Sequence, residues 1–265
     1  MEGNNLQMSY RIKRNVFAPK LKQLTQDFQW QKAHSICYDK CNFHCGFCNV
    51  RNWDRTEFHD YSEREFELTV MVLARDGNRF KFIGGEPTLN PTLERDMAIV
   101  RKHGGVLFLD TNGSRPDVIG RLMDNKLVDV LALSIKGMDS EEAMRVAEIR
   151  NPGLCWDNLF KSLRLAEEHP EVLSMLTVVL TAQMNAQDCL ERVGELLRPY
   201  PHVRLKINNL HENIETQKRK MEANDPVELG GIIARFAENH PEYRGRIVYE
   251  PSHSAVLNYE ELQFY

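Results

Sequence analysis

Short apolar stretches recur along the chain, and longer stretches with helical periodicity separate them. The short stretches are rich in β-branched or alternating apolar residues, which is typical of strands, and they predict strands over 34–38, 80–83, 106–109, 128–135, 173–180, 203–207 and 247–249. In the longer stretches apolar residues return every three or four positions, which predicts helices over 62–75, 91–103, 115–126, 140–148, 156–169, 186–198 and 226–238. Ser62 and Glu65 have the spacing of a capping box at the start of the first helix.

Strands that alternate with helical stretches indicate repeated βα units and a parallel sheet. About six units can be counted, which is fewer than the eight of a complete barrel. We expect an α/β domain over residues 31–250, an N-terminal extension over residues 1–30 and a C-terminal tail over residues 251–265. The extension is polar and weakly periodic, so the pattern assigns it no fold.

Composition narrows the function classes only slightly. The chain has 265 residues, of which 42% are apolar and 27% are charged, and a net charge of -4 gives no reason to expect nucleic acid binding. We see no signal peptide and no apolar run of roughly 20 residues that would span a membrane. We therefore expect a cytoplasmic protein, in which six cysteines favour metal or redox use over a disulfide framework.

Three of these cysteines lie within eight residues, directly after the first predicted strand. Cys41, Cys45 and Cys48 are separated by three and then two residues, with Phe47 before the last. Three thiolates on so short a loop can converge on a soft metal centre and leave one coordination position open, which is a feature of catalytic metal sites. The spacing predicts a [4Fe-4S] cluster with one iron open to a substrate or cofactor.

A zinc site is the alternative to the cluster. Zinc normally takes a fourth protein ligand when its role is structural, and Cys37, His34 or His44 can supply one. In that case the chain would be a zinc-stabilised binding module without catalysis. No second cysteine cluster exists in the sequence, so further iron–sulfur clusters are not expected.

Polar and glycine residues collect at the carboxyl ends of the next predicted strands. Ligands of parallel α/β folds bind in the loops at this edge of the sheet. Two glycines at a strand end allow close approach of a ligand to the backbone, and the carboxylate that follows them can hold an ammonium group. The candidate residues are Gly84, Gly85 and Glu86 after the second strand, Asp110, Thr111 and Asn112 after the third, Ser134 and Lys136 after the fourth, and His211 near the sixth. Each segment is also compatible with an ordinary turn or a solvated loop.

The cysteine spacing and the Gly-Gly-Glu-Pro segment that begins at Gly84 resemble the radical SAM superfamily. This resemblance implies a partial (β/α)6 TIM-type barrel, in which the three cysteines hold the cluster and the open iron binds the amino and carboxylate groups of S-adenosylmethionine (SAM). It also implies that the glycine segment contacts the methionyl amine of SAM. The resemblance covers about residues 34–212.

Three further segments resemble the glycyl radical enzyme activases, the subgroup typified by pyruvate formate-lyase activating enzyme. The Asp-Thr-Asn-Gly segment from Asp110 implies a small monovalent-cation site beside SAM, while Lys136 and His211 are implied in SAM binding. The chain departs from the subgroup at Ser134, where the activases usually have an aspartate. Because a hydroxyl is a weaker cation ligand than a carboxylate, this departure weakens the expectation of a cation site.

By this resemblance the chain is expected to be an enzyme that cleaves SAM reductively and uses the resulting 5′-deoxyadenosyl radical to take a hydrogen atom from its substrate. An electron donor such as flavodoxin or ferredoxin is then needed. Two substrate classes stay open: a glycine loop in a partner protein, which would make the chain an activase, and a small molecule or peptide natural product.

Overall fold

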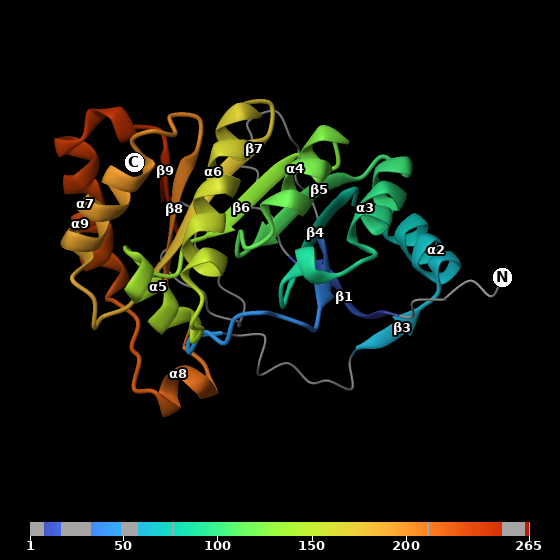
Figure 1. Ribbon diagram of the computed structural model, residues 1–265, viewed down its shortest axis with the longest axis horizontal. Helices are drawn as coiled ribbons and strands as arrows, with labels where there is room; N and C mark the ends of the chain where they lie inside the picture. The colour runs from blue at the N-terminus through green and yellow to red at the C-terminus, as the bar shows by residue number, and fades with distance from the viewer. Residues whose placement is uncertain are drawn as a thin grey trace.

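Seven parallel strands form the centre of a curved ten-stranded sheet. The computed structural model describes residues 8–16, 33–48, 58–75, 77–210, 212–250 and 263–264. Within these residues the strand order is β10-β9-β8-β7-β6-β5-β4-β2-β1-β3, and every pairing from β2 to β9 is parallel. The parallel strands thus lie side by side in chain order, from blue to orange-red in Figure 1.

The strands are β1 (Met8–Val16), β2 (Ala33–Tyr38), β3 (His59–Tyr61), β4 (Arg79–Gly84), β5 (Val106–Thr111), β6 (Val130–Ser134), β7 (Leu173–Leu180), β8 (Arg204–Asn209), β9 (Ile247–Glu250) and β10 (Gln263–Phe264). The helices are α2 (Glu63–Ala74), α3 (Leu93–Lys102), α4 (Pro116–Asp124), α5 (Ser140–Ala147), α6 (Asn158–Glu168), α7 (Ala186–Leu197), α8 (Ile214–Lys218) and α9 (Pro226–Asn239). Short 3₁₀ turns cover Pro87–Leu89 and Pro241–Tyr243, and a π-helical turn covers Gly153–Asp157.

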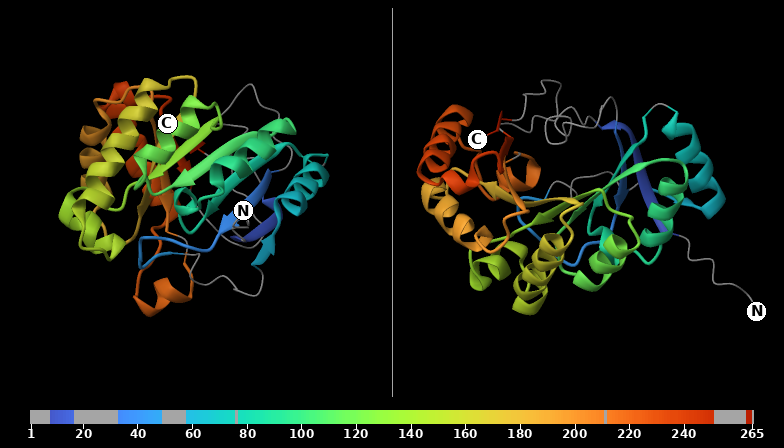
Figure 2. Two further views of the ribbon diagram at one scale, coloured as in Figure 1. Left: turned by 45° about the vertical axis from the view of Figure 1, so that its right-hand side comes forward. Right: turned by 90° about the horizontal axis from the view of Figure 1, so that it is seen from above.

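Helices α2–α7 and α9 lie on the outer, convex side of the sheet (Figure 2, right), whereas α8 lies beyond the ends of the strands (Figure 1). Six parallel strands are each followed by a helix, and β9 is the seventh strand of the series. The antiparallel strands β3 and β10 stand at the two ends of the strand order, so the sheet is not closed on itself. The expected partial (β/α)6 barrel is confirmed. None of the helices in the described ranges has the length and apolar character needed to cross a membrane.

Part of the expected N-terminal extension belongs to the sheet. Strand β1 pairs antiparallel with β2, with Tyr10 opposite Tyr38 and Ile12 opposite Ile36. The polar sequence of this segment did not reveal a strand, because β1 takes its order from pairing with β2 and β3 more than from an apolar pattern of its own. The boundaries of the expected domain (residues 31–250) and C-terminal tail (residues 251–265) stay predictions.

The capping box predicted for the first helix is present. The Ser62 side chain accepts a hydrogen bond from the Glu65 N–H (3.3 Å), and the Ser62 N–H donates to Glu65 Oε2 (2.8 Å). Two backbone N–H groups at the start of α2 are satisfied in this way. The helix therefore begins at Glu63, within one residue of the predicted start.

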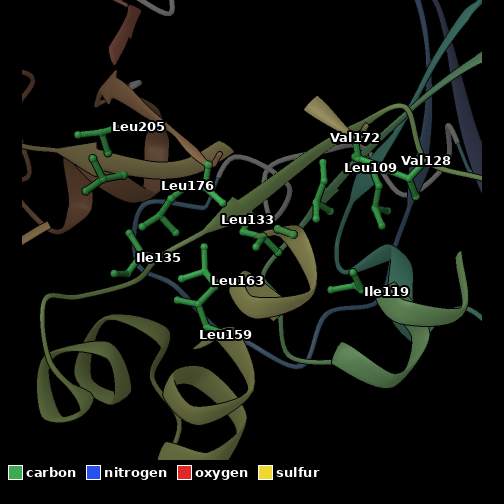
Figure 3. Close-up of a cluster of buried hydrophobic side chains, with 14 of the residues drawn as sticks. Leu109, Ile119, Val128, Leu133, Ile135, Leu159, Leu163, Val172, Leu176 and Leu205 are labelled. Carbon is green, nitrogen blue, oxygen red and sulfur yellow. The ribbon is translucent and has the colours of Figure 1, made fainter. Parts of the chain in front are cut away.

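The main core lies between the sheet and the helices. Leu133 on β6 is fully buried, and it points with Leu176 of β7 toward Leu159 and Leu163 of α6 (Figure 3). Alternate residues of these strands face the helices because successive side chains of a strand point to opposite faces of the sheet. The other face of the sheet is concave, and those candidate residues that the structure describes lie at its carboxyl edge.

We predict that Leu133→Ala lowers the free energy of unfolding by about 2–5 kcal/mol, because it leaves a cavity in a fully packed core. Urea denaturation followed by circular dichroism measures this change. Leu68→Ala is the matched control: Leu68 is 51% exposed on α2, so its truncation should cost less than about 0.5 kcal/mol. Equal losses in the two variants would contradict the assignment of the core.

Candidate active site

The cysteine loop (residues 41–48) follows β2 and packs against the end of helix α5. The His44 N–H donates a hydrogen bond to the carbonyl of Ala147 at the end of α5 (2.8 Å). Phe43 and Cys45 are buried in a small apolar cluster with Ala147 and Cys155. Helix α5 thus supports the loop and turns part of it away from solvent.

The three cysteine thiols lie within electrostatic reach of one another. Burial raises the pKa of Cys41 to about 11, the Phe43 N–H lowers it, and the negative charges of Glu86, Cys45 and Cys48 raise it further. The Cys41 thiol is therefore protonated at neutral pH in the metal-free chain. A metal centre that binds the Cys41 thiolate must displace this proton, so its affinity will rise with pH.

The loop offers three thiols, which is the donor type of an iron–sulfur cluster. Within the described ranges no three His, Cys, Asp or Glu side chains converge on one point, as a single ion would require. A four-iron cluster does not impose this condition, because each thiolate binds a different iron atom. Of the proposed fourth zinc ligands, His34 packs its ring against Phe80, with ring centroids 5.3 Å apart, and is fully buried. It occupies the helix-facing side of β2, since its β4 partner Phe80 belongs to the main core.

Gly84 and Gly85 let the cysteine loop approach the end of β4. Gly84 has φ +120°, and a Cβ there would overlap the backbone of Tyr38. A Cβ on Gly85 would overlap the carbonyl of Lys40. The Gly85 N–H donates to the Tyr38 carbonyl (2.8 Å), and the Glu86 N–H donates to the Lys40 carbonyl (2.6 Å). The close approach expected for a ligand is made here by the protein's own backbone.

The carboxylate of Glu86 joins the loops that follow β4 and β5. Its Oε1 accepts hydrogen bonds from the Thr88 hydroxyl (2.5 Å), the Thr88 N–H (3.1 Å) and the Thr111 hydroxyl (2.5 Å). Its Oε2 accepts from the Asn112 N–H (2.7 Å). The side chain is almost fully buried, and burial raises the pKa of Glu86 although these hydrogen bonds oppose the shift. Both carboxylate oxygens thus accept hydrogen bonds from the protein. Glu86 therefore links the two loops, and its contact with an ammonium group stays a prediction.

The loop after β5 also binds the cysteine loop directly. The Asn112 amide donates to Asn42 Oδ1 (2.9 Å), and the Asn42 amide donates to the Ser114 hydroxyl (2.9 Å). Asn42 lies next to Cys41 in the sequence. The cysteine loop is therefore fixed by hydrogen bonds to both neighbouring loops, which favours a single arrangement of the thiols.

Asp110 is paired with a lysine. Its Oδ2 lies 2.9 Å from Lys81 Nζ. Burial by itself raises the pKa of Asp110, but Lys81, Lys206 and Lys136 together bring it below its usual value. A small cation at this carboxylate would have to compete with the Lys81 ammonium. The structure therefore adds no support for the monovalent-cation site, which is left as a prediction.

A cavity of about 270 Å³ opens beside the cysteine loop, at the ends of β6 and β7. Phe47 and Lys136 line it, and Lys136 Nζ lies 5.5 Å from the centroid of the Phe47 ring. Ser134 is half-buried at the end of β6, where it pairs with Thr177 of β7. His211 lies outside the described residues, so its predicted role is not tested.

Arg219 is a site residue that the sequence did not indicate. It follows α8, lines the same cavity and forms an ion pair with Glu148 at the end of α5. Its side chain also packs over Gly46, where a Cβ would clash with the guanidinium. More than 150 residues separate Arg219 from the cysteine loop that it covers, so no local sequence motif connects the two.

Residues 35–192 match the radical SAM superfamily, and the chain belongs to this family. It is therefore a radical SAM enzyme, of the class that uses SAM and a [4Fe-4S] cluster. This is the family that the cysteine and glycine motifs indicated.

Curated relatives carry different activities in their names. A protein of Methanocaldococcus jannaschii named as a glycyl-radical enzyme activating enzyme is 31% identical over 220 residues, which cover 81% of this chain and 90% of the relative. A protein of Pyrobaculum aerophilum named as a GTP 3′,8-cyclase is 24% identical over 80% of this chain and 72% of its own. A third, from a Thermoplasmatales archaeon, is named as a SAM-dependent nucleotide dehydratase and is 28% identical over 59% of this chain and 55% of the relative.

Solved structures share the fold. SuiB of Streptococcus suis bound to SAM has a TM-score of 0.59 at 17% identity, over 80% of this chain and 48% of that one. A TYW1 structure with a lysine-pyruvate adduct has a TM-score of 0.58 at 18% identity, over 87% of this chain and 86% of that one. The chain thus spans about half the length of SuiB and most of the TYW1 chain.

We predict that Glu86→Ala lowers the melting temperature of the metal-free protein markedly. The change leaves the buried N–H groups of Thr88 and Asn112 without acceptors, each at a cost of about 1–3 kcal/mol. Differential scanning calorimetry measures the effect, with Glu63→Ala as the control because Glu63 is exposed on α2. An unchanged melting temperature combined with weaker SAM binding would make Glu86 a ligand contact only.

Proposed function

We propose that Cys41, Cys45 and Cys48 bind one [4Fe-4S] cluster and that SAM binds at its open iron. When bound, the cluster and SAM supply a 5′-deoxyadenosyl radical that takes a hydrogen atom from the substrate. The observation that carries this proposal is the placement of three thiols on one loop at the carboxyl edge of the sheet, within electrostatic reach of one another, in a chain of the radical SAM superfamily. An electron donor such as flavodoxin or ferredoxin completes the proposal, together with a cytoplasmic location.

The residues around the loop have positioning roles in this proposal. Glu86 and Asn112 hold the cysteine loop against the ends of β4 and β5. Phe47 and Lys136 line a cavity beside that loop, which is the place we assign to the adenosine part of SAM. A ligand there lies between the cysteine loop and the ends of β6 and β7, and so is shielded from water on those sides.

One candidate substrate is a glycine loop in a partner protein, which would make the chain an activating enzyme. The M. jannaschii relative supports this candidate, because the match spans 90% of that protein. The relatives named as a GTP cyclase and a nucleotide dehydratase support a small-molecule substrate instead.

We predict that Cys45→Ala abolishes the cluster and, with it, SAM cleavage. Two thiolates do not hold a four-iron cluster in this loop. The measurement is anaerobic reconstitution with iron and sulfide, followed by iron analysis and by detection of 5′-deoxyadenosine and methionine after reduction in the presence of SAM.

Cys189→Ala is the matched control. Cys189 is a buried cysteine on α7, outside the cysteine loop, and its replacement should leave iron content and product formation near the wild-type level. Iron content in Cys45→Ala equal to that of the wild type would overturn the ligand assignment. A wild-type protein that takes up one zinc ion and no cluster would point to the binding module.

A further inference from the structure

Lys81 and Asp110 lie on the concave face of the neighbouring strands β4 and β5. In the register of these parallel strands Lys81 is opposite Phe108, and Asp110 comes two residues after Phe108. Phe108 belongs to a small apolar cluster of its own, whereas Leu107 and Leu109 on either side of it belong to the main core. Because alternate residues of a strand point to opposite faces, Phe108 and Asp110 share the side of the sheet that faces away from the helices.

The Lys81 side chain runs along this face from one strand to the other. Its ammonium lies 4.7 Å from the centroid of the Phe108 ring and 2.9 Å from Asp110 Oδ2. Two residues of a strand span about 6.6 Å, which a lysine side chain can bridge with its four-carbon stem. Lys81 therefore reaches the carboxylate near the carboxyl end of β5 from a position further back on β4.

The carboxylate of Asp110 needs a positive partner. Its side chain is only 26% exposed, and a carboxylate that is largely removed from water is costly unless a cation or hydrogen-bond donors compensate it. Burial raises the pKa of Asp110, and Lys81 opposes this shift more strongly than any other charged group. Lys206 and Lys136 act in the same direction with smaller effects. Lys81 thus supplies the contact that the carboxylate requires.

The other side chains of the expected cation site are also unsuited to a cation. The Thr111 hydroxyl donates to Glu86 Oε1 (2.5 Å) and accepts from the Gly113 N–H (3.1 Å). Ser134 ends β6 and offers a hydroxyl, which is a weaker cation ligand than a carboxylate. Of the three expected ligands, Asp110 is paired with a lysine, one hydroxyl is used within the protein and the other carries no charge. This donor set does not fit a monovalent cation.

We propose that the Lys81 ammonium takes the place of the monovalent cation at Asp110, so that the chain binds SAM without such an ion. A lysine ammonium and a small cation act alike here, since each brings one positive charge to a partly buried carboxylate. The ammonium is attached to β4, so its charge is present whatever the salt. This inference rests on the proposed function and deepens it, and the expected monovalent cation is the alternative that the experiment decides.

The test compares SAM binding by the reconstituted protein in chloride salts of potassium, sodium and tetramethylammonium. Anaerobic calorimetry at equal ionic strength measures the affinity, and tetramethylammonium serves as a cation too large for a site of bare oxygen ligands. For the wild type we expect the three affinities to agree within about threefold, because general screening is the same in each salt. A larger loss of affinity in tetramethylammonium would overturn the inference. The wild-type comparison needs no substitution, so it decides the inference even where a variant does not fold.

Lys81→Met should create a cation requirement. Methionine keeps an apolar stem against Phe108 but leaves Asp110 without its contact cation. We expect the SAM affinity of this variant to fall about tenfold in tetramethylammonium and to recover in potassium or sodium. Lys81→Arg keeps a positive charge and should need no added ion.

Two further variants complete the comparison. Asp110→Asn in the Lys81→Met background removes the carboxylate that an added ion would bind, so potassium should no longer restore affinity. Lys102→Met is the matched control, because Lys102 forms an ion pair with Glu67 (2.8 Å) between the helices α3 and α2, and it should bind SAM as the wild type does in every salt. Salt-independent affinity in Lys81→Met, or recovery that persists in the double variant, would overturn the inference.

Thermal unfolding of the same preparations reports cation binding without SAM. An ion that binds only the folded chain raises its melting temperature, so potassium should raise that of Lys81→Met by about 2–4 °C more than that of the wild type, relative to tetramethylammonium. This shift without SAM binding would contradict the proposed function and support the inference. SAM binding that requires potassium in the wild type would support the proposed function and overturn the inference.

Discussion

The buried carboxylate of Glu86 is the group on which the arrangement of the site depends. It receives hydrogen bonds from Thr88, Thr111 and Asn112, while its own N–H holds the Lys40 carbonyl of the cysteine loop. A buried carboxylate is costly unless its oxygens are satisfied, so this network stabilises one geometry of three loops at once. The cysteines, the Gly84–Gly85 turn and the Asp110–Gly113 segment are therefore positioned as a unit.

Much of the fold could be predicted from the sequence, because period-2 and period-3.6 patterns report directly which residues face a core. The strand at Leu173–Leu180 and the helix at Ala186–Leu197 were predicted with nearly these bounds. Strand β1 was not predicted, since its order comes from pairing with β2. The short helix α8 was also missed: five residues are too few to show a helical period.

The site was predictable where chemistry requires a fixed local spacing, as in the cysteine loop and the Gly84–Glu86 turn. What the sequence could not show is how these groups are used within the fold. Gly85 accommodates the Lys40 carbonyl, Glu86 fastens two loops, and Asp110 is paired with Lys81. Arg219 comes from a segment far along the chain, and only the folded structure brings it to the cysteine loop.

The most direct test of this account is electron paramagnetic resonance of the reduced, reconstituted protein, recorded with and without SAM. The account predicts the signal of a reduced [4Fe-4S] cluster whose g values shift when SAM is added, because one iron is open and close to the SAM site. A cluster signal that is unaffected by saturating SAM, or a protein that binds zinc and forms no cluster, would contradict it.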